Sequence, residues 1–303
     1  MPNAGTVQSH LFGPPGAPVV AVLGGISATR DARAWWPAIV GDGLAIDTRE
    51  FRVLGFDWLD GGERADGKPA RIVTTHDQAD ALAAVLDSLT VDRVHAIVGA
   101  SYGGMVALAF AERYPDRLER LVVIGAAHEA HPMSTALRSI QRRVVELGLE
   151  TGRARDALSL ARSLAMTTYR SAREFAERFD SEPSSRTDRG VEFPVESYLK
   201  HHGDRFASTW RPERFLALSL SGDLHRVAPS AIKAPATLVA AEGDSIVPRD
   251  QVVELARGVS GPCRLVDLPS DNGHDAFLTE PAALTAILAD ALNASVPSPS
   301  SLR

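Results

Sequence analysis

The chain has 303 residues, of which 45% are hydrophobic and 23% are charged, and its formal net charge is −6. This composition is typical of a globular protein, and a nucleic-acid binder would usually carry a basic patch that is not visible here. Cys263 is the only cysteine, so an internal disulfide is excluded and a reducing compartment is compatible with the sequence. Because we find neither a signal peptide nor an apolar run of the ~18 residues that a membrane span needs, we expect a soluble cytoplasmic protein that does not insert into a membrane.

Short apolar runs alternate with longer helical patterns along most of the chain. In chain order, we predict strands at 19–23, 51–56, 94–98, 121–124, 237–241 and 264–268. Helices are predicted at 77–89, from Gly99 through Ala111, and at 281–292. Strands that alternate with helices indicate βαβ units, and therefore a mostly parallel sheet.

Residues 128–227 interrupt this alternation. The segment is helical in pattern and rich in arginine, lacks convincing strands, and contains a polar loop at 181–190. We interpret it as a helical insertion that forms a lid over the carboxyl edge of the sheet. The predicted organisation is a core formed by 1–127 and 228–294, a lid formed by 128–227, and a Ser/Pro-rich tail at 295–303 that we expect to be disordered.

A candidate nucleophile lies in the sequence Gly99-Ala100-Ser101-Tyr102-Gly103, which has the form G-x-S-x-G. It stands between an expected strand and an expected helix, as a nucleophile elbow requires. Glycines at its two ends remove side chains that would clash in the sharp turn. We therefore predict that Ser101 is a nucleophile; the alternative is a tight loop in which this serine only caps the helix.

The partners of such a serine follow it in the order acid, then histidine. Asp244 follows the strand 237–241 and His274 follows the strand 264–268, which are positions where open α/β sheets carry functional residues. We predict that His274 is the base and that Asp244 orients it. The competing acids are Glu242, Asp223 and Asp267.

The remaining histidines lack this placement. The pairs His201-His202 and His128/His131 are spaced in a way that could serve a metal ion. A metal site would need further converging ligands, so we interpret these histidines as core or surface residues and expect no metal site.

An acyl-transferring serine also needs an oxyanion hole, made of the N–H after the nucleophile and one from a loop after an early strand. The N–H of Tyr102 suits the first position. The loop Gly24-Gly25-Ile26-Ser27 follows the first strong strand, and we predict that Ile26 supplies the second N–H. The alternative is that these glycines only turn the chain.

Several other segments are more specific than G-x-S-x-G. They are Trp35-Trp36, Gly41–Thr48, Val73–Gln78, Ser101–Met105, Ala165–Ser171, Val195–Leu199 and Gly273–Leu278. Together they resemble the homoserine O-acyltransferase family, the α/β-hydrolase-type enzymes of methionine biosynthesis. The resemblance extends from about residue 19 to residue 280.

The resemblance implies an α/β-hydrolase fold, with a mostly parallel sheet, helices on both faces and a helical lid insertion. It implies O-acylation of L-homoserine by an acyl-CoA, through an acyl-serine intermediate in a ping-pong mechanism. Acyl-CoA would be a co-substrate, no cofactor is expected, and the family's habit suggests a homodimer formed through the lid helices.

By position, the resemblance also assigns two binding residues. Arg170 would bind the carboxylate of the amino acid, a task that suits a guanidinium because it can donate two parallel hydrogen bonds. Asp275 would hold the α-ammonium group. Without the resemblance, we would interpret Arg170 as one partner of a surface ion pair in an arginine-rich segment. We would interpret Asp275 as a loop carboxylate that orients the backbone.

The sequence departs from the family at three places. Tyr102 stands where the family's elbow has Met, residues 59–67 replace a Gly-Ser-Thr-Gly-Pro loop, and Phe215 stands where the family has a lid tyrosine. These positions lie where donor and acceptor would be sensed, so the choice between acetyl-CoA and succinyl-CoA stays open.

Three other functions compete. A serine O-acyltransferase differs in an acceptor that is one methylene shorter, which is worth only ~1–3 kcal/mol in a pocket. A carboxylester hydrolase uses the same triad, but a hydrolase of neutral esters does not need Arg170 and Asp275. A binding protein without catalysis would be expected to have lost a member of the triad, and all three candidates are present.

Overall fold

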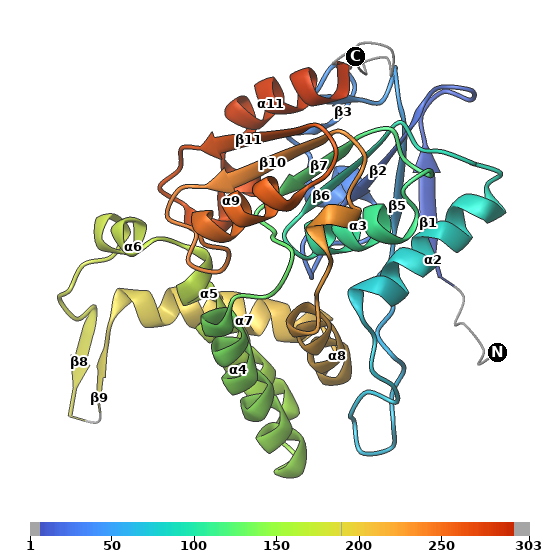
Figure 1. Cartoon of the computed structure of the whole chain (residues 1–303). Helices are drawn as coiled ribbons and strands as arrows, with labels where there is room; N and C mark the ends of the chain where they lie inside the picture. Colours follow the sequence, from blue (N-terminus) through green and yellow to red (C-terminus); the bar gives the residue numbers. More distant parts are fainter. Residues whose placement is uncertain (1–6, 189, 294–303) are drawn as a thin grey trace.

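The computed structural model describes residues 7–188 and 190–293 (Figure 1). Its centre is a seven-stranded sheet in the order β1-β5-β2-β6-β7-β10-β11. The strands are β1 (Ser9–Phe12), β2 (Val19–Leu23), β5 (Arg52–Phe56), β6 (Ala96–Ala100), β7 (Leu121–Ile124), β10 (Ala236–Ala241) and β11 (Cys263–Leu268). Only the pairing of β1 with β5 is antiparallel in this sheet, so the prediction of a mostly parallel sheet is confirmed.

Helices cover both faces of the sheet because successive side chains of a strand point to opposite sides. In β2, Val19, Ala21 and Leu23 belong to one apolar cluster, whereas Val20 and Val22 belong to another. The first cluster packs against α2 (Thr75–Ser88), α3 (Tyr102–Arg113) and α9 (Arg249–Gly258). The second packs against α1 (Ala32–Trp35) and α11 (Pro281–Asn293), which closes the layered core.

Local sequence signals set the ends of the core helices. Thr74 and Asp77 form a capping box at the start of α2, in which each side chain accepts a hydrogen bond from the other's backbone N–H. α3 ends at Arg113, just before Tyr114-Pro115, because proline disfavours helical geometry in the residue that precedes it. The short elements of the core are β3 (Val40–Gly41), β4 (Ile46–Asp47), η1 (Pro229–Ala231), η2 (Gly273–Asp275) and α10 (Ala276–Thr279).

The segment 128–227, called the insertion below, adds no strand to the main sheet within its described residues. Its helices are α4 (Pro132–Glu150), α5 (Ala154–Tyr169), α6 (Ala172–Arg178), α7 (Pro194–Thr209) and α8 (Pro212–Asp223). Figure 1 shows α4, α5, α7 and α8 gathered on one side of the sheet, while α6 extends away from them. Side chains of α4, α5, α7 and α8 form an apolar cluster of their own, which includes Val145, Leu158, Phe206 and Phe215.

The expectation that the insertion lacks strands is wrong in one place. The predicted polar loop at 181–190 contains most of a small antiparallel hairpin, formed by β8 (Ser185–Thr187) and β9 (Gly190–Glu192). Both strands are exposed throughout, so they carry no alternation of apolar and polar residues that could reveal them. The predicted tail at 295–303 lies outside the described residues. No helix in the described part of the chain is long and apolar enough to span a membrane.

Candidate active site

Ser101 lies at the turn between β6 and α3, with backbone angles φ 54° and ψ −121°. This is a strained conformation that few residues other than glycine adopt, and such strain costs about 1–3 kcal/mol. The flanking glycines are required by close packing. A Cβ atom on Gly99 would lie 2.4 Å from the carbonyl oxygen of Gly103, and one on Gly103 would lie 2.2 Å from that of Leu23. The sequence therefore forms the sharp turn that the motif predicts.

Ser101, His274 and Asp244 form one hydrogen-bonded chain. Ser101 Oγ lies 2.7 Å from His274 Nε2, and His274 Nδ1 lies 2.7 Å from Asp244 Oδ2. The other carboxylate oxygen of Asp244 accepts the backbone N–H groups of Ile246 and Val247, at 2.8 and 2.9 Å. Because Asp244 is held by both oxygens and is only 7% exposed, it fixes the orientation of the imidazole ring.

The electrostatics of this chain favour a basic imidazole. Burial lowers the pKa of His274, but the charge and hydrogen bond of Asp244, together with the charge of Asp275, raise it, and the net result is a pKa above the usual value.

The competing acids lie elsewhere. Glu242 is exposed, Asp267 pairs with Arg249 on the surface, and Asp223 lies between two arginines of the insertion.

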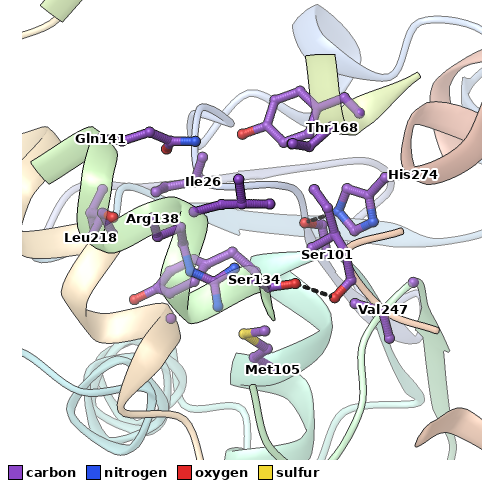
Figure 2. Close-up of a pocket in the computed structure, with 17 residues that line it drawn as sticks. Ile26, Ser101, Met105, Ser134, Arg138, Gln141, Thr168, Leu218, Val247 and His274 are labelled. Atoms are coloured by element: carbon purple, nitrogen blue, oxygen red, sulfur yellow. Dashed lines mark hydrogen bonds between the residues drawn. The ribbon is translucent and has the colours of Figure 1, made fainter. Parts of the chain in front are cut away.

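The loop predicted to supply the second oxyanion donor lies against the nucleophile. A Cβ atom on Gly25 would lie 4.0 Å from Ser101 Cβ. The carbonyl of Gly24 accepts Gly103 N–H, and that of Gly25 accepts the N–H groups of Ala28 and of the Trp58 indole. The Gly25 carbonyl and the Ile26 N–H belong to one trans peptide, in which the two groups point in opposite directions. The Ile26 N–H therefore points away from Ala28 and the Trp58 indole. Ile26 and Tyr102 both line the pocket that contains Ser101 (Figure 2).

That pocket lies between the core and the insertion. The core contributes Ser101, His274, Ile26, Met105 and Val247 among others, while α4, α5 and α8 contribute the opposite wall. The residues of that wall are Ser134, Leu137, Arg138, Gln141, Thr168, Tyr169, Leu218, Ser219 and Gly222. The helices of the insertion thus form one wall of the pocket that contains the serine.

Arg138 was not predicted from the sequence, yet it lines the same pocket as Ser101 (Figure 2). Its Nε donates to Asp223 at 2.6 Å, while its Nη2 is buried and has no hydrogen-bond partner among the described residues. A buried guanidinium N–H without a partner is costly, and it leaves Arg138 with an unused hydrogen-bond donor. The only signal in the sequence is the spacing of Ser134, Arg138 and Gln141, which places three polar residues on one face of a helix.

Arg170 and Asp275 are brought together beside the triad. Arg170 Nε lies 2.9 Å from Asp275 Oδ2, and Arg170 Nη1 lies 3.2 Å from Glu174 and donates to Asn272 at 3.0 Å. Burial raises the pKa of Asp275, and the positive charge of Arg170 opposes this effect. Neither residue is among the described residues that line the pocket of Ser101. Each directly follows one that does, since Tyr169 and His274 are both lining residues.

Two of the three departures from the family pattern connect the core to the insertion. The hydroxyl of Tyr102 lies 2.7 Å from Ser221 Oγ on α8 and accepts a hydrogen bond from Gln78 on α2. In the loop 59–67, Asp60 lies 2.8 Å from Arg211 of the insertion. Phe215 is buried in the insertion's own apolar cluster and is not a pocket residue in the described structure.

The histidine pairs weighed as metal ligands are separate from this site. His201 and His202 pack against each other, and His202 also contacts the ring of Tyr198. Within the described ranges, no group of three His, Cys, Asp or Glu side chains is arranged to hold a metal ion.

Comparisons with known proteins agree with this geometry. A family model described as the alpha/beta hydrolase fold matches residues 18–281. A homoserine O-succinyltransferase from Xanthomonas campestris pv. campestris is 43% identical, over 94% of this chain and 78% of the relative. A serine O-succinyltransferase from Frateuria aurantia is 31% identical, over 86% of this chain and 81% of the relative.

Among solved structures, a homoserine O-acetyltransferase from Bacillus anthracis superposes with a TM-score of 0.84 at 18% identity, over 96% of this chain and 93% of that one, which supports the fold alone. The family is indicated by the 43% identity to a relative over nearly the whole sequence. The elbow and the hydrogen-bonded chain of Ser101, His274 and Asp244 are consistent with it. This chain belongs to the homoserine O-acyltransferase family of the α/β-hydrolase fold.

Proposed function

We propose that this protein transfers a succinyl group from succinyl-CoA to the hydroxyl of L-homoserine, with Ser101 as the nucleophile. The observation that carries the choice of donor is Arg138, which lines the pocket of Ser101 and has a buried Nη2 without a hydrogen-bond partner among the described residues. The family membership supports the reaction class. The 43% identity to a homoserine O-succinyltransferase supports both the donor and the acceptor.

In the first half of the reaction, His274 Nε2 takes the proton of Ser101 Oγ, which attacks the thioester carbonyl. The backbone N–H groups of Ile26 and Tyr102 stabilise the oxyanion that forms. The thioester bond then breaks, the CoA thiolate leaves with the proton from His274, and an acyl-Ser101 ester remains. Asp244 holds the ring and stabilises the imidazolium.

In the second half, the homoserine hydroxyl gives its proton to His274 and attacks the ester carbonyl of the acyl-enzyme. The ester is re-formed on the acceptor oxygen, and the proton returns to Ser101 Oγ. Water can attack the same intermediate, so the insertion that covers the pocket must exclude it. This exclusion separates a transferase from a hydrolase with the same triad.

The case for a succinyl donor is electrostatic. A succinyl group ends in a carboxylate, which an acetyl group lacks, and a buried guanidinium N–H is a suitable partner for it. Arg138 is only 18% exposed in its side chain, and its single acidic partner, Asp223, is shared with Arg142. Two arginines share one aspartate, so one positive charge is left without a negative partner in this cluster. A succinyl carboxylate could pair with that charge, whereas an acetyl group has no charge to pair with it.

The case for an amino-acid acceptor rests on Arg170 and Asp275. Homoserine carries a carboxylate and an ammonium on the same carbon, and the two residues offer one charge of each sign 2.9 Å apart. A zwitterion can pair with both at once. Asp275 directly follows His274, and Arg170 contacts Asp275, so a bound acceptor would direct its hydroxyl toward the base.

The decisive experiment incubates the purified protein with each pairing of L-homoserine or L-serine and succinyl-CoA or acetyl-CoA, and follows thiol release. We expect rapid release only with homoserine and succinyl-CoA. Rapid release with acetyl-CoA would contradict the proposed donor, and a preference for serine would indicate a serine O-acyltransferase. Release that does not depend on any amino acid would mean that water is the acceptor and that the protein is a hydrolase.

We also propose that two copies associate through the insertion. Met133, Ile140 and Leu147 follow one another at seven-residue intervals along α4, and each is at least 50% exposed. Leu160 on the adjacent α5 is 61% exposed, so the apolar stripe extends across two helices. Exposed apolar stripes of this kind favour a partner surface. Light scattering should give twice the chain mass, and Leu147→Glu should reduce it to one chain.

A further inference from the structure

Arg138 is one member of a buried cluster of three charged side chains, which we call the Arg138–Asp223–Arg142 cluster. Asp223 Oδ1 accepts Arg138 Nε at 2.6 Å, and Asp223 Oδ2 accepts Arg142 Nη1 at 2.6 Å. The same Nη1 of Arg142 also donates to Ser219 Oγ at 3.0 Å. The side chain of Asp223 is 5% exposed, so its charge is largely removed from water. Two helices of the insertion, α4 and α8, are joined by these contacts.

The two arginines of the cluster bind the same carboxylate, that of Asp223, but they have different roles. Arg138 lines the pocket, whereas Asp223 and Arg142 do not appear in its described lining. A single arginine paired with a single aspartate would have no net charge and would attract an anionic acyl group only weakly. The second arginine restores a net charge of +1 to the cluster, and Arg138 is the arginine of the two that lines the pocket.

Asp223 also fixes the orientation of the Arg138 guanidinium. It binds the Nε edge of the guanidinium, and the buried Nη2 is left without a partner. A free arginine side chain loses rotamer entropy when it is fixed. The contact with Asp223 removes that freedom before any ligand arrives, which makes binding of a carboxylate less costly.

We propose that Asp223 and Arg142 are positioning residues that give the enzyme its selectivity for a dicarboxylic acyl donor. Asp223 fixes the guanidinium of Arg138, and Arg142 cancels the charge of Asp223 so that the positive charge of Arg138 remains available. This inference rests on the proposed function. Neither residue touches the reacting atoms, and both act only through Arg138.

The test compares succinyl-CoA with butanoyl-CoA, which has the same chain length but ends in a methyl group. The readout is the ratio of the two kcat/KM values, since a general loosening of the fold would lower both together. We expect Arg142→Gln to lower this ratio about tenfold or more, because a hydrogen bond to a charged group is commonly worth that much. Arg142→Lys, which keeps the charge, should retain most of the ratio.

Asp223→Asn provides a second test, of orientation alone: the net charge of the cluster rises to +2, yet the ratio should fall because the guanidinium of Arg138 is no longer fixed. Arg226→Gln is the matched control, since Arg226 is an 80% exposed residue of the insertion that pairs with Glu129 outside the cluster. If the wild-type enzyme does not prefer succinyl-CoA, the proposed donor is wrong and this inference falls with it. If it does prefer succinyl-CoA but Arg142→Gln and Asp223→Asn both retain the preference, the inference alone is overturned. Should Asp223→Asn fail to fold, the pair of Arg142 variants still decides.

Discussion

The two walls of the pocket are built in different ways. The core wall carries Ser101, Asp244 and His274 on loops at the carboxyl ends of strands, where the backbone fixes each side chain. The wall formed by the insertion carries Arg138 on a long helix, where ion pairs between helices fix it. The core wall is suited to the bond-breaking chemistry that the family shares, and the insertion wall is suited to the choice of acyl group. This difference predicts that substitutions in the two walls change the reaction and the choice of acyl group separately.

The largest effect should come from the core wall. Ser101→Ala removes the nucleophile and should lower kcat for thiol release by about 10⁴-fold or more, since triad residues act as a unit. The loss should be the same for every acyl-CoA, because the chemistry does not depend on the acyl end. Thermal melting checks that the variant is folded. Turnover near the wild-type rate would show that another group attacks the thioester.

The next largest effect should come from the insertion wall. Arg138→Leu should lower kcat/KM for succinyl-CoA by about 10- to 100-fold, because a charge-assisted hydrogen bond is lost. Butanoyl-CoA should be turned over at least as well as before. A parallel fall for both donors would show that Arg138 supports the fold of the insertion and does not read the carboxylate.

Arg170 lies where the two walls meet. Replacing it tests whether the acceptor amino acid is bound at that junction. Arg170→Ala should raise the KM for homoserine about tenfold or more, since a charged hydrogen-bond donor is removed. The KM for the acyl-CoA should stay close to its wild-type value. If only the KM for the acyl-CoA rises, the acceptor is bound elsewhere.

The smallest effect should be a change in pH dependence. The negative charge of Asp275 contributes to the raised pKa of His274, so Asp275→Asn should lower that pKa. Because the base must be unprotonated to act, the rate falls as the pH drops through this pKa, and the variant should retain activity to lower pH. The measurement is the acid limb of kcat/KM for acyl-CoA, which reports on the free enzyme. An acid limb that stays in place or moves to higher pH would contradict this electrostatic coupling.

The same division explains what the sequence could predict. Ser101 could be located because the elbow depends on local backbone geometry, and the close contacts at Gly99 and Gly103 require glycine. Asp244 and His274 follow strands whose apolar runs are easily recognised. All six predicted strands of the core are present, and β1 was missed because its four half-exposed residues carry no clear pattern.

The residues to which we assign the choice of acyl group could not be located in this way. Arg138 and Asp223 are 85 positions apart, and their contact depends on how α4 packs against α8. A helical spacing of polar residues shows that they share a face, but it does not show whether that face meets water, another helix or a pocket. Arginines are frequent in the insertion, so composition alone could not distinguish the one that lines the pocket.

The insertion is attached to the core at a sensitive place. Arg170 contacts Asp275 and Asn272, Ser171 donates to the carbonyl of Asp271, and the carbonyl of Thr168 accepts Ser245 Oγ. These contacts join the end of α5 to the loops that carry His274 and Asp244. These contacts tie the position of the insertion to the loop of His274, so a displacement that breaks them would remove support from the proton acceptor of Ser101. A molecule with a displaced insertion would then be catalytically inactive while its pocket is open to water. Acyl-CoA would therefore not be hydrolysed in that state.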